Sequence, residues 1–429
     1  MKERRREGVR RNASVSIPPP STSQPLSVLP VLPVKKPRTM KATIISLIAS
    51  ALIPAGVSAQ TISDVLAGVE RNNTELRAIR QGNDASDLET RQQNVLEDLS
   101  VEYSPFFNKH ASGIASSELV VTQGFDFPTL YGARRKAGRL QREALDMQYR
   151  TARRDILLEA KNICLDIINM NKQRVLLGER RRNADELLAR FTEKYNNGDA
   201  TALELNKIKM DRMNLETELA LADAARATAF EQLCALNGGE PVTLDATEYP
   251  ALPAGADAAI YERAVASDLT VMAAGASVRA AEQDVKVNKQ SWIPKLEIGY
   301  RRNTDGSDAS NGFLIGGSIP LFSSKYKVKA ARLRRSEAEM RHNGARVKAE
   351  SDARAKIKEM RRLRAAAKAY DVPLMRRTLE LLRTAVENGE ISVTDYYVEA
   401  DGVYRNLQAY MDVERQYQGV VADILKNEL

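Results

Sequence analysis

The sequence has 429 residues, of which 43% are hydrophobic and 5% aromatic, with two Cys, two His and a formal net charge of +8. Residues 1–59 hold ten of the 64 basic and two of the 56 acidic residues, so the other 370 residues carry 54 of each. A neutral body argues against nucleic-acid binding, which needs a basic face. Two lone cysteines and two histidines 232 residues apart disfavour a disulfide framework, a zinc site and histidine-base chemistry. The composition therefore disfavours a large enzyme, and we expect no catalytic residues, no bound metal and no cofactor.

Residues 1–59 are predicted to be a leader. Residues 40–59 contain the three parts of a secretory signal: a basic start, the apolar run Ile44–Ile53, and the small residues Val57-Ser58-Ala59 before Gln60. The apolar run is too short for a stop-transfer helix. Residues 1–39 are expected to be an upstream extension, with Met40 as the true start; an unusually long basic region of the signal is the alternative. The protein is expected to be exported.

The body repeats itself about every 190 residues, which predicts a duplicated structural unit. Three unlike landmarks recur at offsets of 193, 192 and 191 residues: Leu76 and Leu269, Pro128 and Pro320, Gly198 and Gly389. We therefore expect a first structural repeat at 60–252 and a second at 253–429.

Each repeat is predicted to contain a helix, a strand pair and a long helical hairpin, which gives a mixed α and β fold. In the first repeat the expected elements are a helix at 61–95, strands near 97–104 and 119–127, and a long helix at 133–196. In the second they are a helix at 256–291, strands near 295–301 and 311–321, and a long helix at 325–388. The strands follow from apolar alternation with a period of two. Pro373 is expected to kink or restart the second long helix.

Each long helix is predicted to end at an Asn-Gly turn, at Gly198 and at Gly389. Asn and Gly accept the left-handed conformation that ends a helix. Thr201 and Ser392 can then cap the returning helix, and an acidic residue three positions later completes a capping box. Each repeat therefore carries a helical hairpin whose tip points away from its strands.

The apolar positions of the long helices are sparse and fall seven residues apart, as in Leu333, Met340 and Val347. Small residues in a heptad repeat, flanked by charge, indicate a thin-seamed coiled coil. The run Arg180-Arg181-Arg182 is interpreted as a solvated helix face, with a docking patch for an acidic partner as the alternative.

Four strands of about ten residues match the hydrocarbon layer of a bilayer when tilted, and their alternation suits lipid on one face and water on the other. Four strands cannot close a pore, and open edges cannot face lipid, so several chains must share one barrel. Three chains would supply twelve strands, an ordinary barrel size. The helices would then pack side by side into a second cylinder. Five aromatic residues are expected to form interfacial girdles, or else to pack against the helices: Tyr103, Phe106, Phe107, Trp292 and Tyr300.

Over residues 60–429 the sequence resembles the TolC-like outer membrane efflux proteins, the outer membrane factors. The resemblance rests on the duplicated layout, the Asn-Gly tips, the segments 292–296 and 319–322 that flank the second strand pair, and the tip segment 388–395. It implies a homotrimer with a twelve-stranded β-barrel in outer-membrane lipid, continued by a periplasmic α-helical barrel. It also implies docking by a periplasmic adaptor, or membrane fusion protein, that links the duct to an inner-membrane transporter. The implied function is a passive exit duct for efflux, gated at the hairpin tips.

In that family an acidic ring on the inner hairpin forms the periplasmic aperture, and Asp395 falls on its first position. The second position, three residues later, is Val398 here, although Glu399 is adjacent. Asp395 and Glu399 are therefore the candidate aperture residues; a helix-capping role for Asp395 is the alternative. The tyrosine and arginine that lock the closed state in the family would fall on Val386 and Ile391, so this closed state must be held differently or less tightly.

A rival hypothesis is an exported coiled-coil structural or adhesin protein without a pore. It explains the leader, the heptads and the neutral charge. It does not explain the four alternating strands or their recurrence beside each hairpin.

Overall fold

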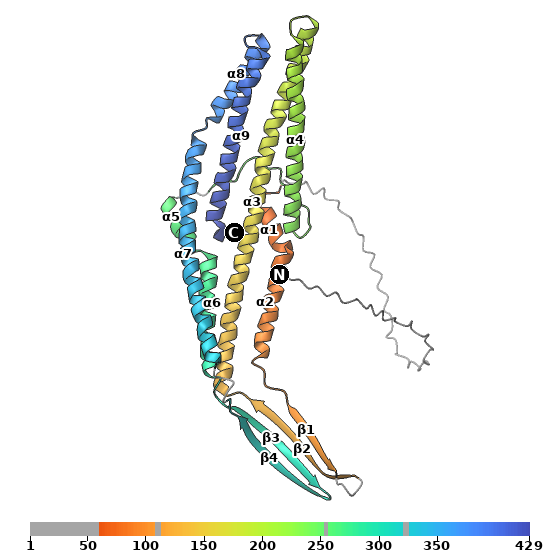
Figure 1. Cartoon of the computed structure of the whole chain (residues 1–429), viewed down its shortest axis with the longest axis vertical. Helices are drawn as coiled ribbons and strands as arrows, with labels where there is room; N and C mark the ends of the chain where they lie inside the picture. Colours follow the sequence, from red (N-terminus) through yellow and green to blue (C-terminus); the bar gives the residue numbers. More distant parts are fainter. Residues whose placement is uncertain (1–59, 108–112, 253–255, 321–325) are drawn as a thin grey trace, which may run out of the picture. The chain divides into compact units, whose positions relative to one another are not determined.

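The computed structural model describes residues 60–107, 113–252, 256–320 and 326–429. The predicted leader at 1–59 therefore lies outside the described residues. The first half contains α1 (Ile62–Asn72), α2 (Thr74–Gln92), β1 (Ser100–Phe107), β2 (Ile114–Phe125), α3 (Pro128–Asn196) and α4 (Ala202–Leu236). The second contains α5 (Asp257–Ala266), α6 (Leu269–Lys289), β3 (Lys295–Asp305), β4 (Asp308–Ser318), α7 (Lys327–Lys368), α8 (Val372–Asn388), α9 (Val393–Ile424) and a 3-10 turn (Lys426–Glu428). Both halves follow the order of short helices, strand pair and helical hairpin (Figure 1), which confirms the predicted mixed helix and strand fold.

The single helices predicted at 61–95 and 256–291 are wrong, because each is a helix pair. Asn73 is extended at φ −58° and ψ 124°, where it ends α1 and caps α2 by accepting the N–H of Leu76 at 3.0 Å. Its amide also donates to the carbonyl of Leu236 at 2.9 Å, which ties the break to the end of α4. Asp268 breaks the second pair in the same way and caps α6. The two breaks lie just before the recurring landmark residues Leu76 and Leu269.

The strands form one antiparallel sheet in the order β1-β2-β3-β4, so β2 and β3 join the two halves. β1 begins three residues later than predicted, at Ser100. β3 and β4 extend into the segment between the two predicted strands, because Thr304 pairs with Ala309 and leaves a tight turn with Gly306 at φ 58°. The outer strands β1 and β4 are the two edges of this sheet.

The two long helices differ in continuity. α3 runs unbroken for 69 residues, about 100 Å at 1.5 Å per residue. The second long helix is interrupted, and α8 restarts with Pro373 in its first turn, as predicted. Asp371 caps this restart by accepting the N–H of Leu374 at 3.0 Å.

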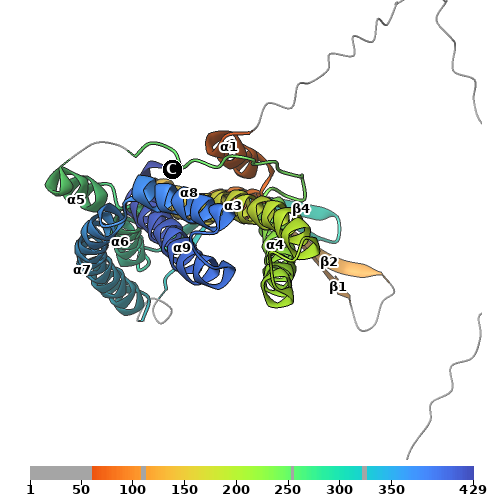
Figure 2. The same ribbon diagram turned by 90° about the horizontal axis from the view of Figure 1, so that it is seen from above.

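The helices pack side by side through small, separate clusters rather than one core. α6 lies between α3 and α7, while α4 packs along α3, and α9 contacts α7, α8 and α3 (Figures 1 and 2). The α3–α6 seam is built on Ala144, Ala276 and Ala280. A larger cluster at the ends of α1 and α4 includes Ile167 and Leu233, both at 0% exposure. Within the described ranges, every helix lacks the apolar length that crossing a membrane would require.

The predicted heptads divide into buried and exposed positions. Ile208 and Leu215 on α4 are at most 1% exposed, as expected of a coiled-coil seam. Leu333, Met340 and Val347 on α7 are 64–66% exposed, so that stripe belongs to no seam within the chain.

The cap at Asn73 provides a test of the helix-pair architecture. Replacing Asn73 with Ala removes the α2 cap and leaves the buried end of α4 without a donor, a loss of about 1–3 kcal/mol. We expect a lower melting temperature by circular dichroism of the detergent-purified protein. Asn206→Ala, an exposed change on α4, is the control and should leave the melting temperature nearly unchanged. Equal melting temperatures for both variants would mean that the hydrogen bonds of Asn73 do not stabilise the protein.

Candidate functional site

Each hairpin tip combines a left-handed glycine with a side-chain cap on the returning helix, and the predicted capping box is complete at Glu204 but incomplete at Asp395. Gly198 lies in the α3–α4 turn at φ 84°, and Gly389 ends α8 at φ 75°, both left-handed. At the first tip, Thr201 caps α4, and its backbone N–H donates to Glu204 at 2.8 Å in a full capping box. These hydrogen bonds, the backbone one first, lower the pKa of Glu204.

The candidate aperture residues Asp395 and Glu399 lie one turn apart on the exposed side of α9. The N–H of Asp395 donates to the Ser392 hydroxyl at 3.1 Å, and that hydroxyl donates back to the Asp395 carboxylate at 2.7 Å. Asp395 therefore belongs to a helix start and also presents a carboxylate to solvent. Val398, the expected second acidic position, instead lines a cavity toward α3 and α4.

The positions expected to lock the closed state are apolar here. Val386 is 1% exposed, and Ile391 packs against the same cluster. This cluster, called here the tip cluster, draws on α3, α4, α8 and α9, and includes Leu187, Phe191, Leu205, Ile208, Val386, Val393 and Tyr396. The two hairpins of one chain are therefore joined by hydrophobic packing near their tips.

Ion pairs between α3 and α8 lie beside the tip cluster. Arg383 on α8 pairs with Glu186 of α3 and with Glu387, and its guanidinium donates to Asn183 at 3.1 Å. Arg190 of α3 pairs with Glu387 at 2.9 Å. The hydrogen bond to Glu387 is the main cause of a raised pKa of Arg383. We call Glu186, Arg190, Arg383 and Glu387 the α3–α8 ion pairs.

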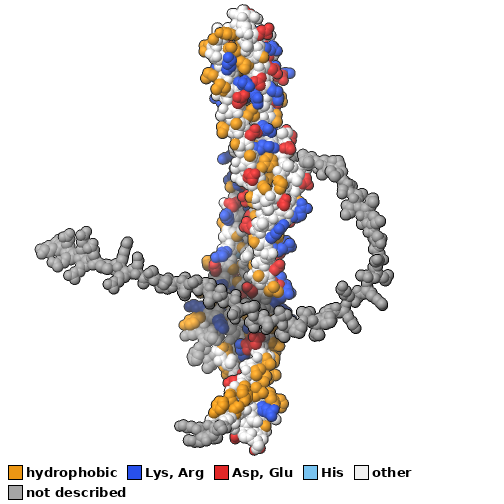
Figure 3. Space-filling model, turned by 90° about the vertical axis from the view of Figure 1, so that its right-hand side faces the viewer, with side chains coloured by type: hydrophobic (Ala, Val, Ile, Leu, Met, Phe, Trp, Pro, Cys, Tyr) orange, Lys and Arg blue, Asp and Glu red, His pale blue; other side chains and the backbone are white. Residues whose placement is uncertain are grey.

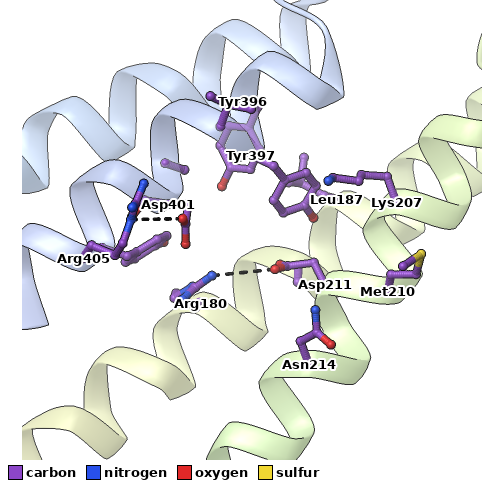
Figure 4. Close-up of a pocket in the computed structure, with 14 residues that line it drawn as sticks. Arg180, Leu187, Lys207, Met210, Asp211, Asn214, Tyr396, Tyr397, Asp401 and Arg405 are labelled. Atoms are coloured by element: carbon purple, nitrogen blue, oxygen red, sulfur yellow. Dashed lines mark hydrogen bonds and ion pairs between the residues drawn. The ribbon is translucent and has the colours of Figure 1, made fainter.

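A cavity of about 400 Å³ lies between α3, α4 and α9, just inside the tip cluster (Figure 4). Arg180 reaches Asp211 at 3.7 Å, and its guanidinium lies 4.4 Å from the centre of the Tyr404 ring. Burial raises the pKa of Asp211. The predicted solvated face is therefore wrong for Arg180, whose side chain is 13% exposed, but is confirmed for Arg181 and Arg182, which are exposed.

The heptad pattern could have placed both charges of this cavity. Arg180 lies seven residues before the buried Leu187, and Asp211 lies between the buried Ile208 and Leu215. Each charge therefore occupies a seam position. Charge alone favoured a solvent-facing interpretation of the sequence, which is why the pair was missed.

Tyrosine side chains of α9 form the other wall of the cavity. Burial raises the pKa values of Tyr396 and Tyr397 above the ordinary range of a phenol. The hydroxyl of Tyr397 is buried without a hydrogen-bond partner among the described residues. The interface between the hairpins is thus apolar at the tip and polar-aromatic behind it.

The sheet has two chemically different faces. In register across all four strands lie Val101, Val121, Tyr300 and Phe313, and the next pair on this face is Ile298 and Ile315. Phe313 and Ile315 are 92% and 86% exposed, and hydrophobic side chains gather over the strands in Figure 3. The opposite face includes Glu102 and the ion pair of Arg301 with Glu118 at 2.9 Å. The apolar alternation predicted from the sequence is thus present in three dimensions.

The five aromatic residues assigned to girdles are all exposed, from 38% for Tyr300 to 71% for Phe107. Packing against the helices therefore does not account for them. Trp292 lies between α6 and β3, at the junction of helices and sheet, whereas Phe106 and Phe107 lie at the far end of β1. Their role in a membrane interface remains a prediction.

Part of the chain matches a known protein family. Residues 260–425 match the sequence model of the family described as "Outer membrane efflux protein". No curated protein sequence matches the chain significantly.

Solved structures with this fold come from several bacteria. A membrane protein from Pseudomonas aeruginosa matches with a TM-score of 0.70 and 17% identity, covering 85% of this chain and 89% of that one. The outer membrane protein VceC from Vibrio cholerae matches at 0.67 and 14% identity, covering 85% and 95%. The CmeC outer membrane channel of Campylobacter jejuni matches at 0.67 and 14%, covering 86% and 85%.

The chain therefore has the fold of these outer membrane proteins, and residues 260–425 match the family model described as outer membrane efflux protein. The resemblance to the TolC-like outer membrane efflux proteins, predicted from the sequence, is confirmed.

The raised pKa of Asp211 predicts how the stability of the folded protein changes with pH. A carboxyl group whose pKa is higher folded than unfolded destabilises the folded state when ionised, and this cost is relieved as pH falls through the folded pKa. Arg180 and Lys207 oppose the shift, while Glu218 and Asp401 reinforce it. We expect Asp211→Asn to melt at a higher temperature than the natural protein at neutral pH, with the gap closing as pH falls toward the ordinary value of 3.8.

Thermal melts at several pH values would check this expectation. Asp199→Asn, in the exposed α3–α4 turn, is the control and should show no such pH-dependent gap. A variant at Asp211 that is less stable at neutral pH would mean that the contact with Arg180 outweighs the cost of burial.

Proposed function

We propose that the chain is one subunit of a homotrimeric exit duct in the bacterial outer membrane. The duct is passive, is gated at the periplasmic hairpin tips and works in efflux. The two structural repeats, 60–252 and 253–429, each supply two strands and one hairpin. The observation that carries the proposal is the four-stranded sheet, with one apolar face, one polar face and two open edges.

An open sheet of this kind needs partners. Unpaired strand edges in lipid leave backbone groups without hydrogen bonds, so β1 of one copy must pair with β4 of another. Strands of 8–12 residues suit a tilted membrane barrel. Three copies give twelve strands, with the face of Phe313 toward lipid and the face of Arg301 toward water.

Exposed apolar stripes on the helices support the same assembly. On the second hairpin the stripe holds Leu333, Met340, Val347, Leu374 and Leu381, and on α4 it holds Leu203, Met210 and Leu221. All are at least 60% exposed in the single chain. Contiguous exposed apolar side chains mark interaction surfaces, and neighbouring hairpins of an α-helical barrel would cover them.

The gate is proposed to lie at the tips. Three copies of Asp395 and Glu399 would gather negative charge at a narrow opening and favour cations. The tip cluster and the α3–α8 ion pairs hold the second hairpin against the first within each subunit. Contact with a periplasmic adaptor, itself linked to an inner-membrane transporter, would shift this equilibrium toward an open state.

The coiled-coil rival without a pore has less support. A coiled-coil adhesin has no need of an apolar sheet face at the end of its helices. The outer membrane channels with this fold also favour the duct.

The proposed aperture can be tested by planar-bilayer recording of the detergent-purified protein, after its mass has shown a trimer. We expect small cation-selective steps, and a cation-to-anion permeability ratio that falls toward one in Asp395→Asn with Glu399→Gln, because six carboxylates per trimer are neutralised. Glu193→Gln, an exposed change at the end of α3, is the control. A monomeric protein without conductance would contradict the proposed duct. Unchanged selectivity in the double variant would contradict only the assignment of Asp395 and Glu399 to the aperture.

The α3–α8 ion pairs give a test of the gate. Arg383→Gln removes the pair with Glu186 of α3 and should favour opening, whereas the pair with Glu387 that it also removes lies within α8. An exposed ion pair contributes about 0.2–1 kcal/mol, so we expect the open probability to rise up to about fivefold for each subunit that loses the pair with Glu186. Arg150→Gln, which removes the exposed pair with Asp146 on α3, is the matched control. Equal open probability in Arg383→Gln and the natural protein would mean that the ion pairs do not hold the gate.

A further inference from the structure

The helices that follow the two strand pairs begin with the same unusual charge pattern. Residues 128–142 of α3 contain five basic residues and no acidic one, and residues 327–336 of α7 also contain five and none. The body as a whole is neutral. Both segments occupy the corresponding place in their half of the chain, directly after a strand pair.

Most of these charges have no partner. Arg134, Arg142 and Arg335 form ion pairs, with Asp126, Asp87 and Glu339 respectively. Seven others are exposed and have no ion-pair partner among the described residues: Arg135, Lys136, Arg139, Lys327, Lys329, Arg332 and Arg334. We call these seven residues the basic belt.

The belt has a cost within the single chain. Lys327 and Lys329 lie in the first turn of α7, where no acidic residue is present, and cations there oppose the helix dipole. The α3 part lines a groove of about 540 Å³ against α2, in which Arg91 adds to the positive charge and Asp87 is the only acidic residue. Contacts among the described residues explain neither arrangement.

The geometry points to what the belt meets. β2 ends at Phe125 and β4 at Ser318, and the helices begin at Pro128 and Lys327, so the belt lies directly beyond the apolar sheet face. Helical side chains tilt toward the N-terminus of their helix, here toward the strands. The belt therefore lies where a bilayer that covers the apolar face presents its headgroups.

We propose that the basic belt binds the headgroups of anionic phospholipids at the periplasmic surface of the outer membrane. This inference rests on the proposed function, because it requires the sheet to lie in a bilayer. A lysine or arginine near an anionic membrane surface contributes about 1 kcal/mol, and salt screens the attraction. Two belt segments per chain would hold the barrel at one depth, with the helices outside the lipid.

The single tryptophan of the chain is a built-in reporter. Trp292 is 66% exposed and follows α6. The end of α6 contacts both belt helices, since Gln283 donates to the carbonyl of Ala133 at 3.2 Å and Glu282 lies 3.6 Å from Arg335. Lipids bound at either belt segment therefore lie near this indole.

The experiment reconstitutes the full chain in phosphatidylcholine bilayers and measures quenching of Trp292 by lipids with brominated acyl chains. Brominated phosphatidylglycerol is compared with brominated phosphatidylcholine at equal mole fraction. We expect a severalfold preference for phosphatidylglycerol that is lost in high salt. Two triple variants should each lower it at least threefold: Arg135→Gln/Lys136→Gln/Arg139→Gln and Lys327→Gln/Lys329→Gln/Arg332→Gln.

A third triple variant is the matched control. Arg346→Gln/Lys348→Gln/Lys358→Gln removes three exposed, unpaired charges that begin about 28 Å further along α7, and it should keep the preference. If this control lost the preference for phosphatidylglycerol equally, or if the natural protein showed no such preference, lipid binding by the basic belt would be contradicted. Loss of the trimer in the belt variants would also contradict it, because such a loss would assign these charges to contacts between subunits.

The outcomes also separate this inference from the proposed function. Equal quenching by both lipids would mean that Trp292 lies at a bilayer but that the basic belt does not prefer anionic headgroups, so only this inference would be contradicted. No quenching by either lipid would mean that the junction meets no bilayer, and the membrane placement of the sheet would fail with it.

Discussion

The open, two-faced sheet is the constraint on which the rest of the molecule depends. Its four strands expose Phe313 and Ile315 almost completely on one face and leave β1 and β4 unpaired at the edges. A single chain cannot satisfy either feature in water or in lipid. The exposed stripes of α7, α8 and α4 present the same demand along the helices. The proposed assembly, edge to edge between sheets and side by side between hairpins, would satisfy both.

The single chain has several separate hydrophobic clusters rather than one large core. Seams built on alanines, such as Ala144 against Ala276, bring helices close but bury little area, so stability is spread over several clusters. Helices that kept their largest apolar side chains for a private core would have none left for neighbours. Two larger clusters are the exceptions: the cluster at the ends of α1 and α4, and the tip cluster, which joins four helices around Val386. Val386 and Ile391, which stand where the family has its polar lock, are part of this apolar packing.

Local chemistry made much of this fold predictable. Period-two alternation, Asn-Gly turns and Pro373 depend on a few adjacent residues, and each occurs where the sequence indicates. The break at Asn73 was missed because an asparagine inside a helical pattern looks tolerable until its amide finds the distant carbonyl of Leu236. Arg180 was missed for a similar reason, since its partner Asp211 comes from another helix. Whether Asp395 and Glu399 surround an aperture depends on other copies of the chain, so it remains a prediction.

The two hairpins are alike in order but not in mechanics. α3 is one rigid helix of 69 residues, whereas its counterpart is divided, which leaves α8 as a separate helix of 17 residues. Asp371 caps the start of α8, and Gly389 ends it in a left-handed conformation. Backbone groups at both ends of α8 therefore have hydrogen-bond partners, although α8 does not continue α7. Its position then depends on what it touches: the tip cluster on one side and the ion pairs with α3 on the other. A separate helix held by moderate contacts against a continuous one is what the proposed gate at these tips would require, because such contacts can be exchanged at small free-energy cost.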